Sequence, residues 1–263
     1  MTLSSEWRPT VSMLGWGLNE EENLQRYVER AEAFLRSVSE DFELILIDDG
    51  STDRTWEIAS DLQRTRPWLR LLRNDVNRGS GFCYRHAIGA VSKGYFLAQT
   101  VDWSYDISTI AASFQLLREF DVLQGTRDRV VSVHALLHRS DNLFKGVVSA
   151  INYVLIRTLF GAPFSDYQNV TVCPARLVRG LQLEADSSFA NPEVLLKLWW
   201  QGASFMELPV SFRPRTRGRG KGTRWRSIVG SISEILEYWF LWTVVGRRKH
   251  RGAGTIARWD ASQ

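Results

Sequence analysis

The chain has 263 residues, of which 44% are hydrophobic and 24% charged, a balance typical of a globular domain with a sizeable core. The net charge of +4 is unevenly distributed, because seven Lys or Arg residues lie between 213 and 226 and four more between 247 and 251. Such local cationic patches indicate a phosphate-bearing partner or an anionic membrane surface. Two cysteines, Cys83 and Cys173, exclude a disulfide framework and a zinc module, and they fit a reducing compartment.

The first half of the chain predicts alternating strands and helices. Short apolar runs indicate strands over residues 11–14, 42–47, 69–72, 95–99 and 122–124. Helical spacing of apolar residues fills the intervals, at 24–35, around 58–62, at 83–91 and at 107–120. This order implies an α/β fold with an open, mostly parallel central sheet flanked by helices and joined by right-handed crossovers.

The second half is less regular. Helices are expected at 140–160, 177–181, 192–200 and 227–245, and a strand broken by Pro209 at 205–212. We therefore expect a catalytic domain over 1–226, which includes a basic loop at 213–226, followed at 227–263 by an amphipathic helix and a basic tail. The glycines within the basic loop are typical of a mobile lid.

Polar side chains follow three of the predicted strands. Asn19 and Glu20 come after the first, Asp48 and Asp49 after the second, and Asp102 after the fourth. Ligands of open α/β sheets bind at the carboxyl ends of the strands, where carboxylates can bind base and ribose or hold a divalent metal on a diphosphate. The alternative for the Asp48 segment is a turn and helix cap without ligand. No GxGxxG follows the first strand, which disfavours a dinucleotide-binding fold.

Several segments then resemble one family. They are 19–24 (NEEENL), 46–55 (LIDDGSTDRT), 77–81 (NRGSG), 125–127 (GTR), 139–142 (RSDN), 192–193 (PE) and the loop from Pro209 to Lys221. On these motifs the chain resembles family-2 glycosyltransferases of the GT-A (nucleotide-diphospho-sugar transferase) fold, and among them the polyprenyl- and dolichol-phosphate sugar synthases. The resemblance covers roughly residues 10–226 and is most specific at 46–55.

The resemblance implies roles for individual residues. It places a GDP- or UDP-linked sugar donor against Asn19, Glu20, Asp48, Asp49, Arg78, Gly79, Thr100, Val101 and Asp102, with Asp49 on the base. Asp102, helped by Ser104, would hold Mg²⁺ or Mn²⁺ on the diphosphate. The catalytic set would be Asp102, Asp166, Arg127, Arg139, Arg215 and Lys221, in which the arginines hold phosphate groups and the lysine closes over the donor.

The metal motif departs from the family pattern. The usual Asp-x-Asp is Thr100-Val101-Asp102 here, and Ser104 stands where a Gln often assists the metal. Losing a charged oxygen ligand should weaken binding of Mg²⁺ or Mn²⁺. The first loop also differs, because Trp16-Gly17-Leu18 replaces Pro-x-Tyr and alters stacking on the base.

The resemblance favours an inverting transfer of the sugar to a polyprenyl phosphate, either dolichyl or undecaprenyl. A lipid phosphate is already anionic at neutral pH and needs cations rather than a general base. The first alternative is transfer to a hydroxyl of a glycan or small natural product, which requires a base, and Asp166 is then the candidate. The second alternative is a degenerate, non-catalytic nucleotide-binding subunit, which Thr100 motivates.

The C-terminal helix indicates where the protein works. The sequence contains no run of 18 apolar residues, so no ordinary membrane-spanning helix is expected, and residues 1–10 lack the apolar core of a signal peptide. An apolar stretch at 238–245 followed by basic residues suits a helix in the membrane interface, peripheral at the cytoplasmic face. The alternative is a helix packed on the catalytic domain or on a partner subunit, and a homo-oligomer is compatible with the sequence. No RRM, OB or helix-turn-helix pattern indicates nucleic acid.

Overall fold

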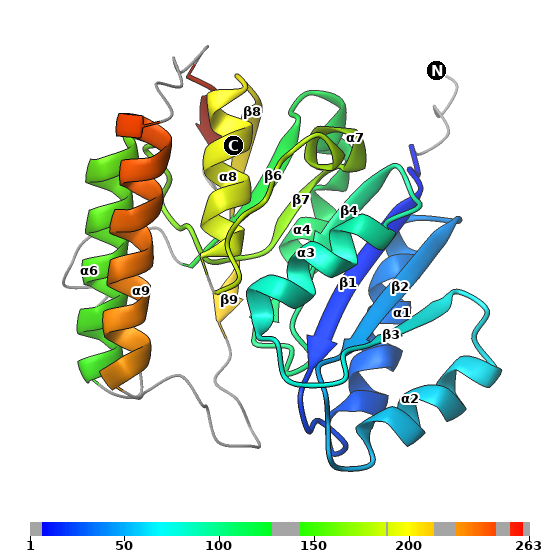
Figure 1. Cartoon of the computed structure of the whole chain (residues 1–263). Coiled ribbons are helices and arrows are strands. Elements are labelled where there is room, and N and C mark those ends of the chain that lie inside the picture. The colour runs from blue at the N-terminus through cyan, green and yellow to red at the C-terminus, as the bar shows by residue number, and fades with distance from the viewer. Residues whose placement is uncertain (1–6, 128–142, 188, 213–224, 246–252, 260–263) are drawn as a thin grey trace, which may run out of the picture.

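The computed structural model describes residues 7–127, 143–187, 189–212, 225–245 and 253–259. Its centre is a sheet of eight strands in the order β10-β8-β6-β7-β4-β1-β2-β3 (Figure 1). The strands are β1 (Val11–Gly17), β2 (Phe42–Asp48), β3 (Leu69–Arg73), β4 (Tyr95–Ala98), β6 (Val122–Thr126), β7 (Thr171–Pro174), β8 (Ser204–Pro209) and β10 (Thr255–Arg258). All neighbours pair in parallel except β7, which runs antiparallel between β4 and β6. The predicted α/β fold with a mostly parallel sheet is therefore confirmed.

Helices cover both faces of this sheet. They are α1 (Leu24–Val38), α2 (Thr55–Arg64), α3 (Ser80–Ala90), α4 (Ser108–Ala112), the 3-10 helix η1 (Phe114–Arg118), α6 (Leu143–Phe160), α7 (Ala175–Arg179), α8 (Ala190–Trp200), α9 (Trp225–Trp239) and the π-helical η2 (Phe240–Val245). Strand β2 shows how two cores arise, because all seven of its residues are buried. Leu44 and Leu46 join the core under α1 and α4, whereas Ile45 and Ile47 join the core under α3 and α8.

Helices α6 and α9 lie side by side at one end of the molecule, away from β3 (Figure 1). A second, two-stranded sheet pairs β5 (Tyr105–Asp106) with β9 (Ser211–Phe212) in antiparallel fashion. It joins the segment after β4 to the segment after β8. The strand predicted at 205–212 is thus interrupted at Val210, directly after the proline, and its two parts enter different sheets.

Three details differ from the sequence expectation. The helix expected at 107–120 divides into α4 and η1, and the helix expected at 227–245 continues from α9 into π-helical η2. Strand β7 was not expected, and neither was β10, which lies in the part assigned to a basic tail. β10 returns to the main sheet beside β8, where Arg258 forms an ion pair with the buried Glu207 at 3.0 Å. A four-residue edge strand is held by such pairing rather than by its own apolar pattern, which explains why the sequence does not indicate it.

The topology brings the predicted site residues to one edge. Strands β1, β2, β4 and β6 share one direction, so their carboxyl ends meet at the same side of the sheet. Residues 17–20, 48–49, 100–102 and 127 lie at or just after these four ends. Segments far apart in sequence therefore converge on one region.

Candidate donor and acceptor site

Asp49 is the centre of a hydrogen-bond network between β2 and α3. Its Oδ1 accepts hydrogen bonds from Asn74 Nδ2 at 2.8 Å and from the backbone N–H of Arg78 at 2.9 Å, and its Oδ2 accepts from Gly79 N–H at 2.9 Å. The side chain is buried. Gly79 has φ +90°, a conformation that a residue with a side chain rarely adopts. Asp49 therefore fixes the donor loop, which we define as residues 74–79, in front of α3.

Asp48 points to different partners. Its Oδ1 accepts a hydrogen bond from Ser51 N–H at 3.1 Å, and its Oδ2 lies 3.0 Å from Arg73 Nε in an ion pair. Gly50 follows with φ +75°, and a Cβ there would lie 2.6 Å from the carbonyl carbon of Val76. The Asp-Asp-Gly turn thus needs its glycine because the donor loop packs directly on it.

The loop after β1 is joined to the same turn. Asn19, with φ +55°, accepts a hydrogen bond from Thr52 N–H at 2.9 Å, and its own N–H donates to Ser51 Oγ at 2.9 Å. Glu20 N–H donates to Thr55 Oγ1 at 2.8 Å. These bonds align the Asn19-Glu20 segment with the Asp48 turn, as their shared edge predicted.

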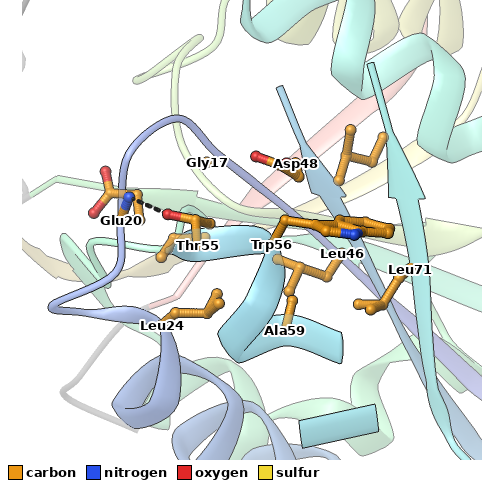
Figure 2. Close-up of a pocket in the computed structure, with 11 residues that line it drawn as sticks. Gly17, Glu20, Leu24, Leu46, Asp48, Thr55, Trp56, Ala59 and Leu71 are labelled. Carbon is orange, nitrogen blue, oxygen red and sulfur yellow. Dashed lines mark hydrogen bonds between the residues drawn. The ribbon is translucent and has the colours of Figure 1, made fainter. Parts of the chain in front are cut away.

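A pocket opens beside these loops (Figure 2). Three predicted nucleotide-binding residues, Glu20, Asp48 and Val101, contribute to its wall. Its remaining lining comes mainly from β1, β2, β3, α1 and α2, namely Gly17, Leu24, Leu46, Ile47, Thr55, Trp56, Ala59 and Leu71. Figure 2 shows Glu20 and Thr55 at one end and the Trp56 indole at the other. The lining is therefore mainly apolar, and Glu20, Asp48 and Thr55 are among its few polar side chains.

The Thr100-Val101-Asp102 segment follows β4. Asp102 Oδ1 accepts hydrogen bonds from Thr100 Oγ1 at 2.5 Å and from Ser104 N–H at 3.3 Å. Trp103 has φ +49°, and its ring packs edge-on against Tyr27 with centroids 5.8 Å apart. The hydroxyl that replaces a carboxylate at position 100 thus donates to the surviving carboxylate.

This donor set allows a direct test of metal fit. Asp102 supplies a hard carboxylate and Ser104 a hydroxyl, which are ligand types that Mg²⁺ and Mn²⁺ accept. In the part of the chain that the structure describes, no group of three or more His, Cys, Asp or Glu side chains could hold a metal ion. The oxygens of Asp102 and Ser104 thus match the ligand preference of these ions, and a diphosphate would have to supply further oxygens.

Arg127 and Asp166 form the strongest ion pair of the site. Arg127 Nε and Nη2 lie 2.7 and 2.9 Å from the two carboxylate oxygens of Asp166, a bidentate arrangement. Asp166 also accepts bonds from the Arg127 and Gln168 backbone N–H groups and from Asn169 Nδ2. Burial alone would raise the pKa of Asp166, but Arg127 and these hydrogen bonds lower it below the ordinary value.

Tyr105 lies in the electrostatic field of this pair. Its hydroxyl donates to the carbonyl of Gln168 at 2.9 Å, and burial raises its pKa to about 12. The charges of Arg127, Asp166 and Asp102 act on the pKa of Tyr105 as well. The three predicted residues at 102, 127 and 166 are therefore brought into one region, with β5 beside them.

Three predicted residues lie outside the described ranges. They are Arg139, Arg215 and Lys221, together with most of the basic loop at 213–226. Their predicted roles stay predictions.

The sequence did not indicate several residues that take part in these hydrogen-bond networks. Asn74 and Tyr105 carry no motif, and Pro192-Glu193 was recognised without a role for its carboxylate. Glu193 is fully buried and accepts hydrogen bonds from the backbone N–H groups of Glu184 and Ala185. The one available signal was an acidic residue beside the apolar run of α8.

The fold is that of GT-A glycosyltransferases. Compared with solved structures, the chain is similar to the mannosyltransferase PcManGT from Pyrobaculum calidifontis in complex with GDP-Man and Mn²⁺. The TM-score is 0.60 at 15% identity, over 91% of this chain and 65% of that one. At such low identity the likeness concerns the fold.

The family model of glycosyl transferase family 2 matches residues 18–175, and the chain belongs to this family. Among curated relatives it is 26% identical over 232 residues to glycosyltransferase AglD of Haloferax volcanii, covering 85% of this chain and 35% of AglD. It is 30% identical over 152 residues to the undecaprenyl-phosphate 4-deoxy-4-formamido-L-arabinose transferase of Pectobacterium carotovorum, covering 57% of this chain and 43% of that enzyme. The chain thus spans less than half the length of both relatives. Family membership is therefore shown, whereas these relatives do not decide the acceptor of the sugar.

Proposed function

We propose that this protein is an inverting transferase that moves a sugar from a GDP- or UDP-linked donor to a polyprenyl phosphate. The observation that carries this choice of acceptor is the state of Asp166. Its two oxygens are engaged by Arg127, Gln168 and Asn169, and its pKa is lowered. A carboxylate stabilised in this way is a poor acceptor for a substrate proton. A phosphate acceptor requires no such base, because it is already an anion.

The donor half of the proposal rests on the loops around Asp48 and Asp49. Asn19 and Glu20 are hydrogen-bonded to residues that follow Asp48, and Asp49 holds the N–H groups of Arg78 and Gly79 in a fixed loop. The undecaprenyl-phosphate transferase named above and the GDP-Man complex of PcManGT support the substrate classes. The nucleoside diphosphate departs with negative charge, which cationic groups must stabilise.

Mg²⁺ or Mn²⁺ belongs to the proposal. Asp102 and Ser104 would hold the ion, because carboxylate and hydroxyl oxygens are ligand types that it accepts. When bound, the ion would neutralise charge on the diphosphate. The protein's own contribution is to hold Asp102 in place through Thr100 Oγ1 and Ser104 N–H, beside the Arg127–Asp166 pair.

The outer surface of α6 and α9 supports attachment to the cytoplasmic face of a membrane. Large apolar side chains that are at least 40% exposed lie along these helices and η2: Ile151, Val154, Leu236, Phe240, Leu241, Val244 and Val245. In contrast, Ile235 and Trp242 are buried against the domain. None of the described helices combines the length and apolar character needed to cross a bilayer. An interfacial helix pair with basic flanking sequence suits an anionic surface, where a lipid phosphate is found.

The deciding experiment measures release of nucleoside diphosphate by the full chain. A panel of GDP- and UDP-sugars is incubated with Mg²⁺ or Mn²⁺, with or without undecaprenyl phosphate, and lipid-linked sugar is identified by mass spectrometry. We expect release that depends on the lipid phosphate. We also expect a rate that varies little between about pH 7 and 9, where a phosphate monoester with second pKa near 6 stays ionised. Release with a saccharide or alcohol but not with lipid phosphate would instead support a hydroxyl acceptor.

The hydrogen bond from Thr100 to Asp102 favours a second candidate, a nucleotide-binding subunit without turnover. Nucleotide binding without release of diphosphate, unchanged in Thr100→Asp, would support that candidate.

A further inference from the structure

We propose that residues 182–187, here called the 182–187 segment, couple the docking of α9 to the donor loop, so that bilayer binding and nucleotide binding strengthen each other. The segment lies between α7 and α8 in the chain and contacts both α3 and α9. The proposal rests on the proposed function only for the nature of the two ligands, a nucleoside diphosphate and an anionic bilayer. It requires neither a sugar nor a lipid phosphate acceptor.

The first contact is with the start of α3. A Cβ on Gly81 would lie 2.2 Å from the carbonyl carbon of Asp186 and 2.3 Å from the carbonyl oxygen of Ser187. Backbone therefore packs on backbone there, with no side chain to absorb a displacement. Arg85, one turn further along α3, forms an ion pair with Asp186 and donates to the carbonyl of Leu183 at 3.2 Å.

This start of α3 is the end of the donor loop. The N–H groups of Arg78 and Gly79, which bond to Asp49, come immediately before Ser80 at the first position of the helix. A movement of the 182–187 segment therefore displaces α3 and the N–H groups that hold Asp49. The positioning of Asp49 in this way is independent of whether Asp49 itself touches the base.

The segment is stiff enough to transmit such a movement. Glu193, which is fully buried, accepts hydrogen bonds from the N–H groups of Glu184 at 2.8 Å and Ala185 at 2.9 Å. Lys197 neutralises Glu193 one helical turn away and also donates to the carbonyl of Gln182. The segment is thereby tied to α8 at several points and moves with it.

The second contact is with α9 and η2. Ser187 Oγ donates to Glu234 of α9, and Trp242 Nε1 of η2 donates to Glu184. The ammonium of Lys197 lies 4.5 Å from the centre of the Trp242 ring, a cation–π arrangement. The two hydrogen bonds link α9 and η2 to the segment that supports α3, and the contact with Lys197 links η2 to α8.

The geometry of η2 explains why a bilayer would favour the docked arrangement. In π-helical η2, Trp242 is 4% exposed while Phe240 and Val244 are 51% and 49% exposed. η2 thus directs the Trp242 side chain into the domain and exposes the apolar side chains of Phe240 and Val244. π-Helical turns are uncommon and occur often at functional sites. A surface that takes up Phe240 and Val244 would hold Trp242 on Glu184, and through the segment would order the donor loop.

Coupling of this kind is reciprocal and can be measured from both sides. The affinity of the full chain for GDP and UDP, at fixed Mg²⁺, is measured by titration calorimetry with and without vesicles containing phosphatidylglycerol. Partition onto the same vesicles is measured with and without saturating nucleotide. We expect both affinities to rise by the same factor, about fivefold or more, within the usual range of allosteric coupling.

Matched variants on α9 test the route. Glu234→Ala removes the bond to Ser187, whereas Glu237→Ala removes an equal charge from an exposed position of the same helix. We expect Glu234→Ala to bring the coupling factor close to one with little change in vesicle-free nucleotide affinity, and Glu237→Ala to keep the wild-type factor. Trp242→Phe, which lacks the indole N–H, should act like Glu234→Ala.

Several results would overturn the proposal. They are a factor of one in the wild type, an absence of vesicle binding, or equal factors in Glu234→Ala and wild type. Failure to bind either diphosphate in the vesicle-free titration would overturn the proposed donor class as well. Failure of transfer to lipid phosphate leaves the coupling measurement intact, so the two proposals fail separately.

Discussion

Two glycines of α3 provide a sharp test of the packing that supports the donor loop. At Gly81 a new methyl group would approach backbone atoms of Asp186 and Ser187 to between 2.2 and 2.5 Å. At Gly89, eight residues further along the same helix, no atom lies within 4 Å of the corresponding position. The same substitution by alanine should therefore have opposite effects at the two sites.

The magnitudes follow from packing and helix propensity. Overpacking costs about 1–3 kcal/mol, and here the obstructing atoms are backbone that cannot rotate away. For a chain of this size each kcal/mol shifts Tm by about 2–4 °C, so Gly81→Ala should lower Tm by about 2–12 °C. Gly89→Ala should raise stability by about 0.5–1 kcal/mol, because alanine loses less entropy in a helix.

Thermal unfolding of the two variants, followed by circular dichroism and checked by urea titration, measures this difference. We also expect Gly81→Ala to weaken nucleotide binding, whereas Gly89→Ala should not change it. A Gly81→Ala protein with the Tm of the wild type, or one as stable as Gly89→Ala, would refute the close approach of the 182–187 segment to α3.

Three further predictions concern charge. Asp166→Asn should lower the free energy of unfolding by about 3 kcal/mol, because it leaves the Arg127 charge uncompensated, and urea unfolding measures this. Since the pKa of Asp166 is lowered, this loss of stability should shrink as pH falls through the lowered pKa. A loss that stays constant with pH would contradict the prediction. Burial raises the pKa of Glu234, and neighbouring carboxylates add to this despite the hydrogen bond from the Ser187 hydroxyl. The protonated side chain therefore favours the folded state below the ordinary carboxyl pKa. This contribution to stability disappears as pH rises through the raised pKa. Glu234→Gln should therefore increase Tm at neutral pH and match the wild type in acid, and an unchanged Tm at neutral pH would count against this. Thr100→Asp should give detectable Mn²⁺ binding without nucleotide, measured by electron paramagnetic resonance, whereas the wild type with Asp102 alone should need a diphosphate; equal binding by both proteins would show that Thr100 does not limit the site.

The sequence predicted the order of the elements well where each element has its own periodic pattern. The run Phe42–Asp48 is buried at every position, as a continuous apolar strand requires, and α1 buries Leu24, Val28, Ala31 and Leu35 at helical spacing. β7 and β10 were missed because, unlike the equally short β4, neither is a continuous apolar run, and both depend on pairing with neighbouring strands. The π-helical turn of η2 was missed because an α-helix and a π-helix share nearly the same apolar pattern.

By itself, the sequence determined the α/β fold, the family and the polar segments that meet at one edge of the sheet, because strand ends and turn residues are local features. Only the tertiary structure decided which of these side chains are engaged with one another. Asp49 binds N–H groups 29 and 30 residues away, and Asp166 pairs with an arginine 39 residues away. Such pairings depend on how the sheet brings distant loops together. Hence the chemical state of each carboxylate, and with it the choice between base and structural support, depends on contacts that no motif contains.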